Sequence, residues 1–542
     1  MCVRLAMARA AATDAEPLLA RRASCGGAPL CCTFAARVAA TASLSGLAFG
    51  YEIGIIDGVL SMDSFRLFMG TGARDAAGHV VELPAAASLD GWIVASFLSG
   101  AVLGSLLVAW LADARGRRES ILIGGALFAL GGAAQAGARG VASLALGRVV
   151  SGAGVGLLSS AAPLYITEAA APAARGRLVA AQQLAITVGV LLASGVNAAL
   201  LGAAGGADAA WRGALAAQVV PGAAVLALVA ALPRSPRWLV ARGRRAEAAA
   251  TLARLRDAPA GGAAVEAELA AIDAEVAEEE GGAPPGAFTC ALWRARVREL
   301  LGPAARRARL VAALQAFQQL SGINIILYFA SNLIEKAGAI SRADAARSLV
   351  VGNSALLVLS TLPAMALLDS PRAGRRALLI GGAAAMAAAH AATAACLLAG
   401  GAAYGAVAAM MLFTAAFAAS WGPTVWVMTN EVLPLRVRAQ GAALGATTNW
   451  LVNAVLGKVA PLAVAASPGG TFAALAAVCA LMCAYAVFCV PETAARSLED
   501  LAGDLWREGK APRAAWAAEA GGAGGGGAAA ESDCAPLREE KM

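Results

Sequence analysis

The sequence predicts an all-α membrane protein whose twelve transmembrane helices form two six-helix halves. Three observations support this fold class. The 542 residues are 59% hydrophobic and only 15% charged, whereas about a quarter of the residues in a soluble domain are charged. Apolar stretches of roughly 20 residues recur, each long enough to cross about 30 Å of hydrocarbon as a helix. Short polar motifs of the first half return in the second half.

Twelve apolar segments are expected to span the membrane, six on each side of a polar linker. The first six lie near residues 36–60, 91–112, 119–138, 142–166, 177–202 and 212–232. The last six lie near residues 308–332, 346–368, 377–399, 403–429, 438–462 and 471–490. The chain therefore divides into a tail (1–35), a first half (36–232), a linker (233–307), a second half (308–491) and a second tail (492–542). The first apolar segment begins too late for a secretory signal, so we expect an uncleaved helix.

The linker is expected to contain helices and the second tail to be mostly disordered. The stretch "VEAELAAIDAEVAEEE" has helical spacing with an acidic end, and "GGAPPG" ends it. A short second helix is expected near "LWRARVREL". The second tail contains "GGAGGGGAAAESD", a composition typical of disorder.

Arginines mark one side of the predicted bundle. The formal net charge is +7, but the arginines cluster in short loops between apolar segments. This pattern encodes membrane orientation and gives no reason to expect a nucleic-acid partner. One side, which also carries the linker, holds Arg115, Arg117, Arg118, Arg175, Arg177, Arg372, Arg375, Arg376, Arg436 and Arg438. The opposite loops are poorer in arginine, with Arg66, Arg74 and Arg139 among them, so both tails are expected to be cytoplasmic.

The two halves carry matching motifs about 260 residues apart. "DARGRR" (113–118) corresponds to "DSPRAGRR" (369–376), and "EAAAPAAR" (168–175) corresponds to "EVLPLRVR" (431–438). Two six-helix halves with corresponding motifs are the organisation of carriers in which one half rocks against the other. In such carriers the binding site lies between the halves, near the bilayer midplane.

Signals for catalysis or a bound cofactor are absent from the sequence. The ten cysteines are scattered without a CxxC pair, and there are only two histidines. No GxxxxGK[ST] phosphate-binding loop is present. We therefore expect neither an enzyme nor a metal or other cofactor, and gradients must supply the energy of any uphill step.

A set of ordered motifs carries a family resemblance. "GRVVSGAGVG", "PLYITE", "QQLSGINIILYF", "WGPTVW" and "PET" follow one another between residues 36 and 505. With these motifs the chain resembles the sugar porters of the major facilitator superfamily. "GYEIGIIDGVLSMDSF" (50–65) is most similar to plant and algal monosaccharide–proton symporters. The resemblance implies the major facilitator fold and alternating-access transport of a hexose with protons. A facilitative uniporter, a polyol or myo-inositol carrier and a sugar-sensing receptor remain as alternatives.

The chain departs from the family pattern at several positions. Arg234 replaces the acid of the family's Pro-Glu-Ser-Pro-Arg motif, and Ala114 replaces an arginine. "DSPRAGRR" carries two additional residues, and Phe329 stands where a second tyrosine is common. Leu357 falls on the position of a sugar-binding asparagine, while Asn353 lies out of register. Residues 61–90 contain no cysteine, so the disulfide of the plant symporters is not expected there.

Amides and aromatic rings are the predicted sugar ligands. Amide groups offer both donors and acceptors to sugar hydroxyls, and Gly322 permits a helix break that would bring Gln318 and Asn324, six residues apart, to one cavity. Asn449 and Asn453 are four apart and share a helix face. The alternative for each amide is a contact between helices. The predicted ligands are Gln183, Gln318, Gln319, Asn324, Asn449, Asn453, Trp426 and Phe49.

Glu52 is the predicted proton site. A carboxylate inside an apolar helix costs several kcal/mol unless it is paired, hydrated or protonated. The resemblance implies a partner in Arg148, and a change in their separation would couple proton affinity to conformation. Two alternatives remain: a static pair that only orients the first helix, and a proton site at Asp57, about 140° further around an ideal helix.

Acids and arginines at repeated offsets are predicted to gate the cytoplasmic side. Asp113, Arg117, Glu168, Arg175, Arg375, Glu431 and Arg438 would form ion pairs between the halves. The alternative is plain positive-inside topology. The expected partners are a monosaccharide, protons and the lipid bilayer, with a monomer as the functional unit. The plasma membrane is the expected location, although "DAEPLL" fits an endomembrane sorting signal.

Overall fold

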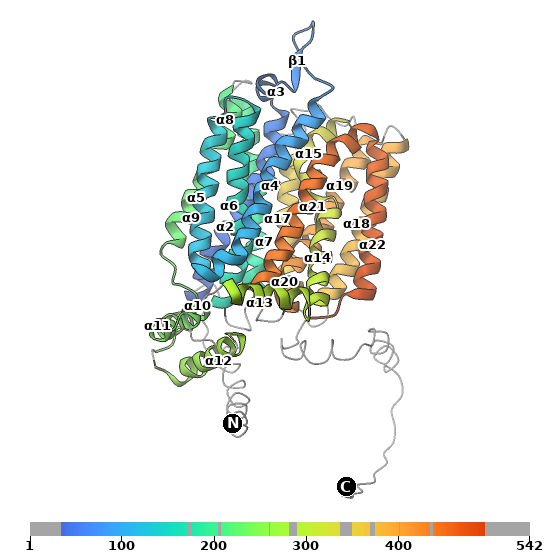
Figure 1. The fold of residues 1–542 in the computed structure, drawn as a ribbon. Helices are drawn as coiled ribbons and strands as arrows, with labels where there is room; N and C mark the ends of the chain where they lie inside the picture. The colour runs from blue at the N-terminus through green and yellow to red at the C-terminus, as the bar shows by residue number, and fades with distance from the viewer. Residues whose placement is uncertain are drawn as a thin grey trace, which may run out of the picture.

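A computed structural model describes residues 34–493, apart from 171–174, 204–207, 260, 281–289, 337–348, 369–373, 400–401 and 434–436. Within these residues, 12 helical spans are long and apolar enough to cross a membrane. They stand roughly parallel in one bundle (Figure 1). The predicted fold class is therefore confirmed, and the chain is a multi-pass integral membrane protein.

The first six spans contain five continuous helices and one interrupted helix. The continuous helices are α2 (Phe34–Ser61), α4 (Ala86–Ala114), α5 (Arg117–Ala136), α6 (Val141–Ala169) and α7 (Arg175–Ala203). The sixth span consists of α8 (Asp208–Ala216) and α9 (Val219–Val229). We predicted one helix there, near 212–232, and the structure corrects this with an interruption at Gln218.

The last six spans contain two further interruptions. Their elements are α14 (Ala305–Leu320) with α15 (Ile323–Lys336), α17 (Val351–Leu368), α18 (Arg375–Ala399), α19 (Ala403–Ala418) with α20 (Trp421–Val432), α21 (Arg438–Ala466) and α22 (Pro468–Cys489). The break predicted at Gly322 is present, because this residue has φ of +88° between α14 and α15. The break before Trp421 was not predicted.

Elements outside the bundle distinguish its two ends. At the hairpin end lie α3 (Asp63–Met69) and the antiparallel strands β1 (Gly72–Arg74) and β2 (Val80–Glu82), which were not predicted (Figure 1). At the linker end lie α10 (Pro236–Ala241), α11 (Arg245–Leu255), α12 (Ala263–Glu280) and α13 (Cys290–Leu301). The two helices predicted in the linker correspond to α12 and α13, and α10 and α11 are additional.

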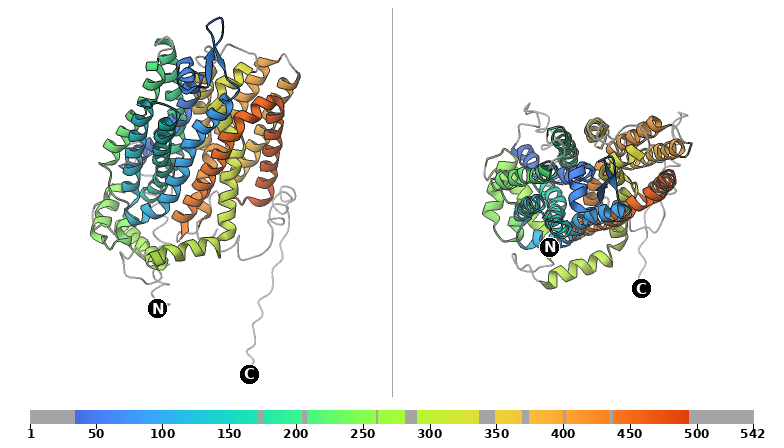
Figure 2. Two further views of the ribbon diagram at one scale, coloured as in Figure 1. Left: turned by 45° about the horizontal axis from the view of Figure 1, so that its top comes forward. Right: turned by 90° about the horizontal axis from the view of Figure 1, so that it is seen from above.

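Seen from above, the first and last six spans form two bundles side by side (Figure 2). Between the bundles, α4 packs on α21, and α7 packs on α17. Near the linker end the Ser105 and Thr447 hydroxyls are 3.2 Å apart. Towards the hairpin end Lys458 donates to the Ser88 carbonyl at 2.8 Å, and the Ser194 and Ser354 hydroxyls are 2.9 Å apart. Both ends therefore hold contacts between the halves, with a polar interior between them.

Candidate functional site

A cavity with an empty volume of about 500 Å³ lies between the two bundles. Seven predicted sugar ligands line it: Phe49, Gln183, Gln318, Gln319, Asn324, Trp426 and Asn449. Apolar side chains such as Ile53, Leu327, Leu357 and Phe417 complete the wall, and no lining residue is charged. A second hollow shares Phe49, Gln183 and Trp426 and extends to Pro163. The arrangement is chemically suited to a neutral polyhydroxyl ligand.

The amides of the second half form a connected network along one wall of this cavity. Asn324 Nδ2 donates to Gln319 Oε1 at 2.6 Å, and Gln319 Nε2 donates to Asn449 Oδ1 at 2.9 Å. Asn449 Nδ2 in turn donates to Gln318 Oε1 at 2.9 Å and to Gln315 Oε1 at 2.8 Å. The network fixes the orientation of each amide before a ligand arrives, and Gln315 is a member that sequence reasoning missed.

Two helix breaks meet at Gln318. Its Nε2 donates to the carbonyl oxygens of Trp421 at 3.0 Å and Gly422 at 3.1 Å, at the start of α20. These contacts are the interhelical role that we kept as the alternative for each amide, and they occur together with a place in the cavity wall. Gly322 provides the other break, which allows Asn324 to reach Gln319 although α14 has ended.

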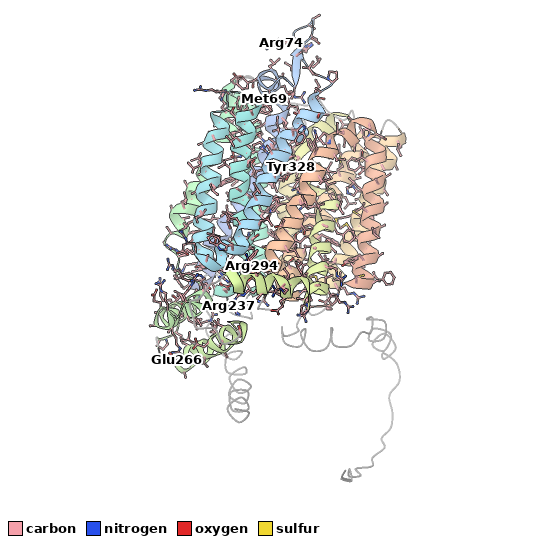
Figure 3. All side chains as sticks on the ribbon, in the orientation of Figure 1. Met69, Arg74, Arg237, Glu266, Arg294 and Tyr328 are labelled. Atoms are coloured by element: carbon pink, nitrogen blue, oxygen red, sulfur yellow. The ribbon has the colours of Figure 1, made fainter. Side chains whose placement is uncertain are left out.

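Asn453 departs from the prediction. It was expected to face the cavity together with Asn449, but it lies outside the cavity lining. Its Nδ2 donates to the Tyr328 hydroxyl at 3.1 Å. Figure 3 places Tyr328 inside the bundle, between Arg74 at the hairpin end and Arg294 on α13. Asn453 is one helical turn beyond Asn449, and that advance of about 6 Å carries it past the cavity.

An aromatic chain runs from the cavity into the first half. Phe49, in the cavity wall, has its ring centre 4.9 Å from that of Trp450 on α21. Trp450 also contacts Phe97 at 6.1 Å, and the Arg148 guanidinium lies 5.5 Å from the Phe97 ring centre. Trp450 was not predicted, although it follows Asn449 directly in the sequence.

Glu52 and Arg148 form a buried ion pair, as the resemblance implied. Glu52 Oε1 lies 3.1 Å from Arg148 Nη1, and both side chains are almost completely inaccessible. Arg148 Nε also donates to the Ile93 carbonyl at 2.7 Å. Tyr328, on the second half, lies near enough to interact electrostatically with both charges. The hydrogen bonds described for the pair come from the first half, and Tyr328 is a group of the second half that lies near it.

Two amides that the sequence analysis missed complete a ring around this pair. Gln218 Nε2 donates to Glu52 Oε2, and Gln218 Oε1 accepts from Gln135 Nε2 at 3.1 Å. Arg148 Nη1 donates to Gln135 Oε1 at 3.4 Å, which closes the ring. The available signal was the isolation of Gln135 and Gln218 within otherwise apolar segments, because a polar group in the membrane needs a partner.

At the linker end of the first half, Arg117 pairs with Glu168 at 2.9 Å and with Asp113 at 3.4 Å. Asp113 Oδ2 also lies 3.0 Å from Arg296 on α13 and accepts from Gln440 Nε2 on α21 at 3.1 Å. Asp113 thus connects the first half, the linker and the second half. The contact to α21 uses an amide, in contrast to the ion pairs predicted between the halves.

In the second half, Arg375 pairs with Glu431 at 3.0 Å. Glu492 of the "PET" motif accepts from the backbone N–H groups of Arg375 and Arg376, each at 3.0 Å, and so caps α18. Arg438 donates to the Leu433 carbonyl at 3.3 Å. The Arg175 side chain lies outside the described residues. The ion pairs described for Arg117 and Arg375 join elements of the same half, and the predicted pairing between the halves stays a prediction.

The departures from the family pattern have structural counterparts. Arg234 stands where the family has an acid, and its Nη2 lies 2.7 Å from a carboxylate oxygen of Glu119. The arginine at this position therefore forms an ion pair with Glu119. Leu357 lines the central cavity, whereas Asn353 lines a separate hollow. Both positions therefore agree with the register counted from the sequence.

Twelve spans in two bundles, with a polar cavity between them, define a transporter of the major facilitator type. Residues 38–505 match the family described as "Sugar (and other) transporter". The chain belongs to this family.

Individual relatives extend over most of the chain. The galactose-proton symporter of Escherichia coli (strain K12) is 32% identical over 86% of this chain and 93% of its own length. The high glucose sensor RGT2 of Saccharomyces cerevisiae is 31% identical over 77% of this chain but only 53% of its own length. The solved structure of the proton:xylose symporter XylE, bound to 6-bromo-6-deoxy-D-glucose, has a TM-score of 0.73 at 27% identity and covers 86% of this chain and 98% of that chain.

Proposed function

We propose that this chain transports a monosaccharide, a hexose above all, together with protons by alternating access. One observation carries the proposal. The buried Glu52–Arg148 pair lies one helical turn from Phe49, which lines an uncharged, amide-rich cavity between the halves. The similarity to a galactose-proton symporter supports both the sugar and the proton.

The cavity suits a sugar because the polar lining side chains are neutral amides and one hydroxyl. Sugar hydroxyls both donate and accept, and amides do the same. Trp426 and Phe49 offer rings that can cover the apolar face of a pyranose. The amides hydrogen-bond to one another, so a bound sugar would exchange some of these bonds for its own. Gln183, on the opposite wall, then holds the sugar from the first half.

Coupling follows from the charge of Glu52. A proton on this carboxyl group removes its attraction for Arg148 and leaves the guanidinium to its remaining acceptors, the Ile93 carbonyl and Gln135. Movement of the second half, which carries Tyr328, would change the surroundings of both charges. Because linkage is reciprocal, a conformation that binds sugar more tightly must then also bind the proton differently.

The orientation follows from the arginine-rich loops. We place the linker end in the cytoplasm and the hairpin end outside, since positive loops remain on the cytoplasmic side. The proposal includes a monomeric functional unit in the plasma membrane and, within the family, a closer relation to the plant and algal symporters. Vacuolar or other internal membranes are the alternative location.

Simultaneous measurement of sugar and proton flux in proteoliposomes tests the proposal. Purified full-length chain should accumulate labelled glucose when the external pH is lowered and should acidify the lumen as it does so. Competition by galactose, xylose and myo-inositol separates a hexose carrier from a polyol carrier. Sugar flux without proton flux would show a facilitative uniporter, and either result would overturn part of the proposal.

A sugar sensor is the second candidate, favoured by the similarity to the high glucose sensor. The chain spans only about half of that protein. The same proteoliposomes decide between the two functions, because a sensor would bind sugar in equilibrium dialysis and yet show no flux above that of empty vesicles.

A further inference from the structure

His390 is a buried side chain that the proposed mechanism does not use. It lies on α18, which contributes nothing to the cavity lining, and its side chain is completely buried. Its Nε2 is 2.9 Å from the backbone carbonyl oxygen of Ser321. Ser321 stands between α14 and α15, directly before Gly322. His390 therefore reaches from a peripheral helix to the break in the helix that carries three of the cavity amides.

The chemistry of the contact fixes its direction. A carbonyl oxygen only accepts hydrogen bonds, so the imidazole Nε2 must carry the hydrogen. In a continuous helix this carbonyl would accept from the N–H of Ile325, but that N–H donates instead to the Gly322 carbonyl at 3.0 Å. The break thus leaves a buried acceptor without its helical partner, and the His390 ring supplies the missing donor.

Neighbouring aromatic rings hold the imidazole in place. Its centre is 4.0 Å from that of Phe413 on α19 and 5.6 Å from that of Phe472 on α22. Leu475, also on α22, closes the other side of the break, because a β-carbon on Gly322 would lie 2.8 Å from it. Three helices of the second half, α18, α19 and α22, therefore surround the break between α14 and α15.

We infer that His390 is a positioning residue for the sugar site, an inference that rests on the proposed function. By satisfying the Ser321 carbonyl it holds α14 and α15 in the broken arrangement. That arrangement brings Asn324 Nδ2 to 2.6 Å from Gln319 Oε1 and directs the amide network towards the cavity. Without the donor, the carbonyl regains its hydrogen bond by straightening the helix, and the amides separate.

Two complementary substitutions test this hydrogen bond separately from packing. His390→Phe keeps an aromatic ring between Phe413 and Phe472 but removes the donor. His390→Gln loses the ring but carries an N–H at the distance of Nε2 from the backbone. Thr393→Val is the matched control on α18, because within the described residues the Thr393 hydroxyl donates to the Ala389 carbonyl of its own helix, at 2.9 Å.

The measurement is the dissociation constant of D-glucose or D-galactose, whichever the wild-type chain binds more tightly, with thermal unfolding of each variant alongside. We expect His390→Phe to weaken binding about tenfold, the scale of one lost hydrogen bond to a buried group. His390→Gln and Thr393→Val should bind within about twofold of wild type. Normal binding by His390→Phe, or equal weakening by the Phe and Gln variants, overturns the inference.

Two further experiments show which inference fails if the expected weakening is not observed or a variant does not fold. If Gln318→Ala also binds sugar normally, the proposed sugar site fails; if it binds weakly while His390→Phe binds normally, only the role of His390 fails. If a His390 variant does not fold, nitrogen-15 NMR of labelled histidine tests the proposed hydrogen bond directly. In the His79→Gln background His390 is the only histidine, and its spectrum should show the neutral tautomer with hydrogen on Nε2. Hydrogen on Nδ1 alone overturns the inference.

Discussion

The two halves place their polar groups beside helix breaks in opposite ways. In the first half, the interruption between α8 and α9 presents Gln218 to Glu52, inside a ring that the protein itself completes. In the second half, the breaks at Gly322 and before Trp421 meet at Gln318 and present amides to an open cavity. The first half thus holds a buried charge, and the second half lines a cavity with neutral amides. The comparison teaches that the proposed proton site and the proposed sugar site are built differently.

The largest expected effect concerns the buried pair of Glu52 and Arg148. Glu52→Gln removes the carboxylate proposed to bind the proton but keeps an amide of similar shape beside Arg148 and Gln218. We expect it to abolish uphill sugar uptake while sparing downhill sugar exchange, since the cavity lining is unchanged. Uptake and exchange are measured in the same proteoliposomes.

Asp57→Asn is the control for this variant, because Asp57 is a second buried acid of α2. It should leave both uphill uptake and exchange intact. If the Glu52→Gln protein still accumulates sugar with the wild-type dependence on external pH, Glu52 does not couple the two fluxes and a static pair is the better description.

A smaller effect is expected at the amides that line the cavity. Gln318→Ala and Asn324→Ala should each weaken sugar binding by roughly 1–3 kcal/mol, or about 5- to 150-fold, because a buried polar site loses one partner. Asn353→Ala is the matched control, since this amide lines a different hollow. Near-normal affinity in both cavity variants, measured at normal surface expression, would remove these residues from the site.

A more moderate effect is expected from a substitution at the break between α14 and α15. Gly322→Ala places a β-carbon at φ of +88° and against Leu475. An L-residue in this left-handed conformation costs about 1–2 kcal/mol, so the thermal midpoint and the sugar affinity should both fall. Gly381→Ala, where a β-carbon meets open space, should change neither. Equal behaviour of the two variants would show that the break does not depend on Gly322.

The smallest effect is expected at the linker end. Glu431→Gln weakens the pair with Arg375, which is partly exposed and contributes on the order of 1 kcal/mol or less. The conformational equilibrium should shift towards the state open at the linker end. Single cysteines introduced at that mouth should react faster with a membrane-impermeant maleimide, and unchanged labelling rates would contradict a gating role.

Hydropathy predicted the twelve spans because a membrane helix must satisfy its backbone internally and present apolar side chains. Hydropathy does not report the interruptions at Gln218 and Ser420, although Pro221 with Gly222 and Gly422 with Pro423 follow them within four residues. Proline removes a backbone donor from the helix, so a local signal for both interruptions was available. Gly322 was predictable because it separates two amides that otherwise point apart. The repeats showed which acids correspond between the halves, but not which arginine each would meet. Gln135 and Gln218 lie in separate helices and become neighbours only after folding.

The contact between α2 and α7 leaves no clearance for a methyl group. A β-carbon on Gly50 would lie 1.8 Å from the Ile186 carbonyl oxygen, and one on Gly189 would lie 2.3 Å from that of Leu47. Sliding either helix by one residue, about 1.5 Å, would press a side chain into the partner's backbone. The two helices are therefore packed too closely to slide along each other. Because α2 carries Glu52 and α7 carries Gln183, the proposed proton site and one wall of the cavity belong to the same tightly packed pair of helices.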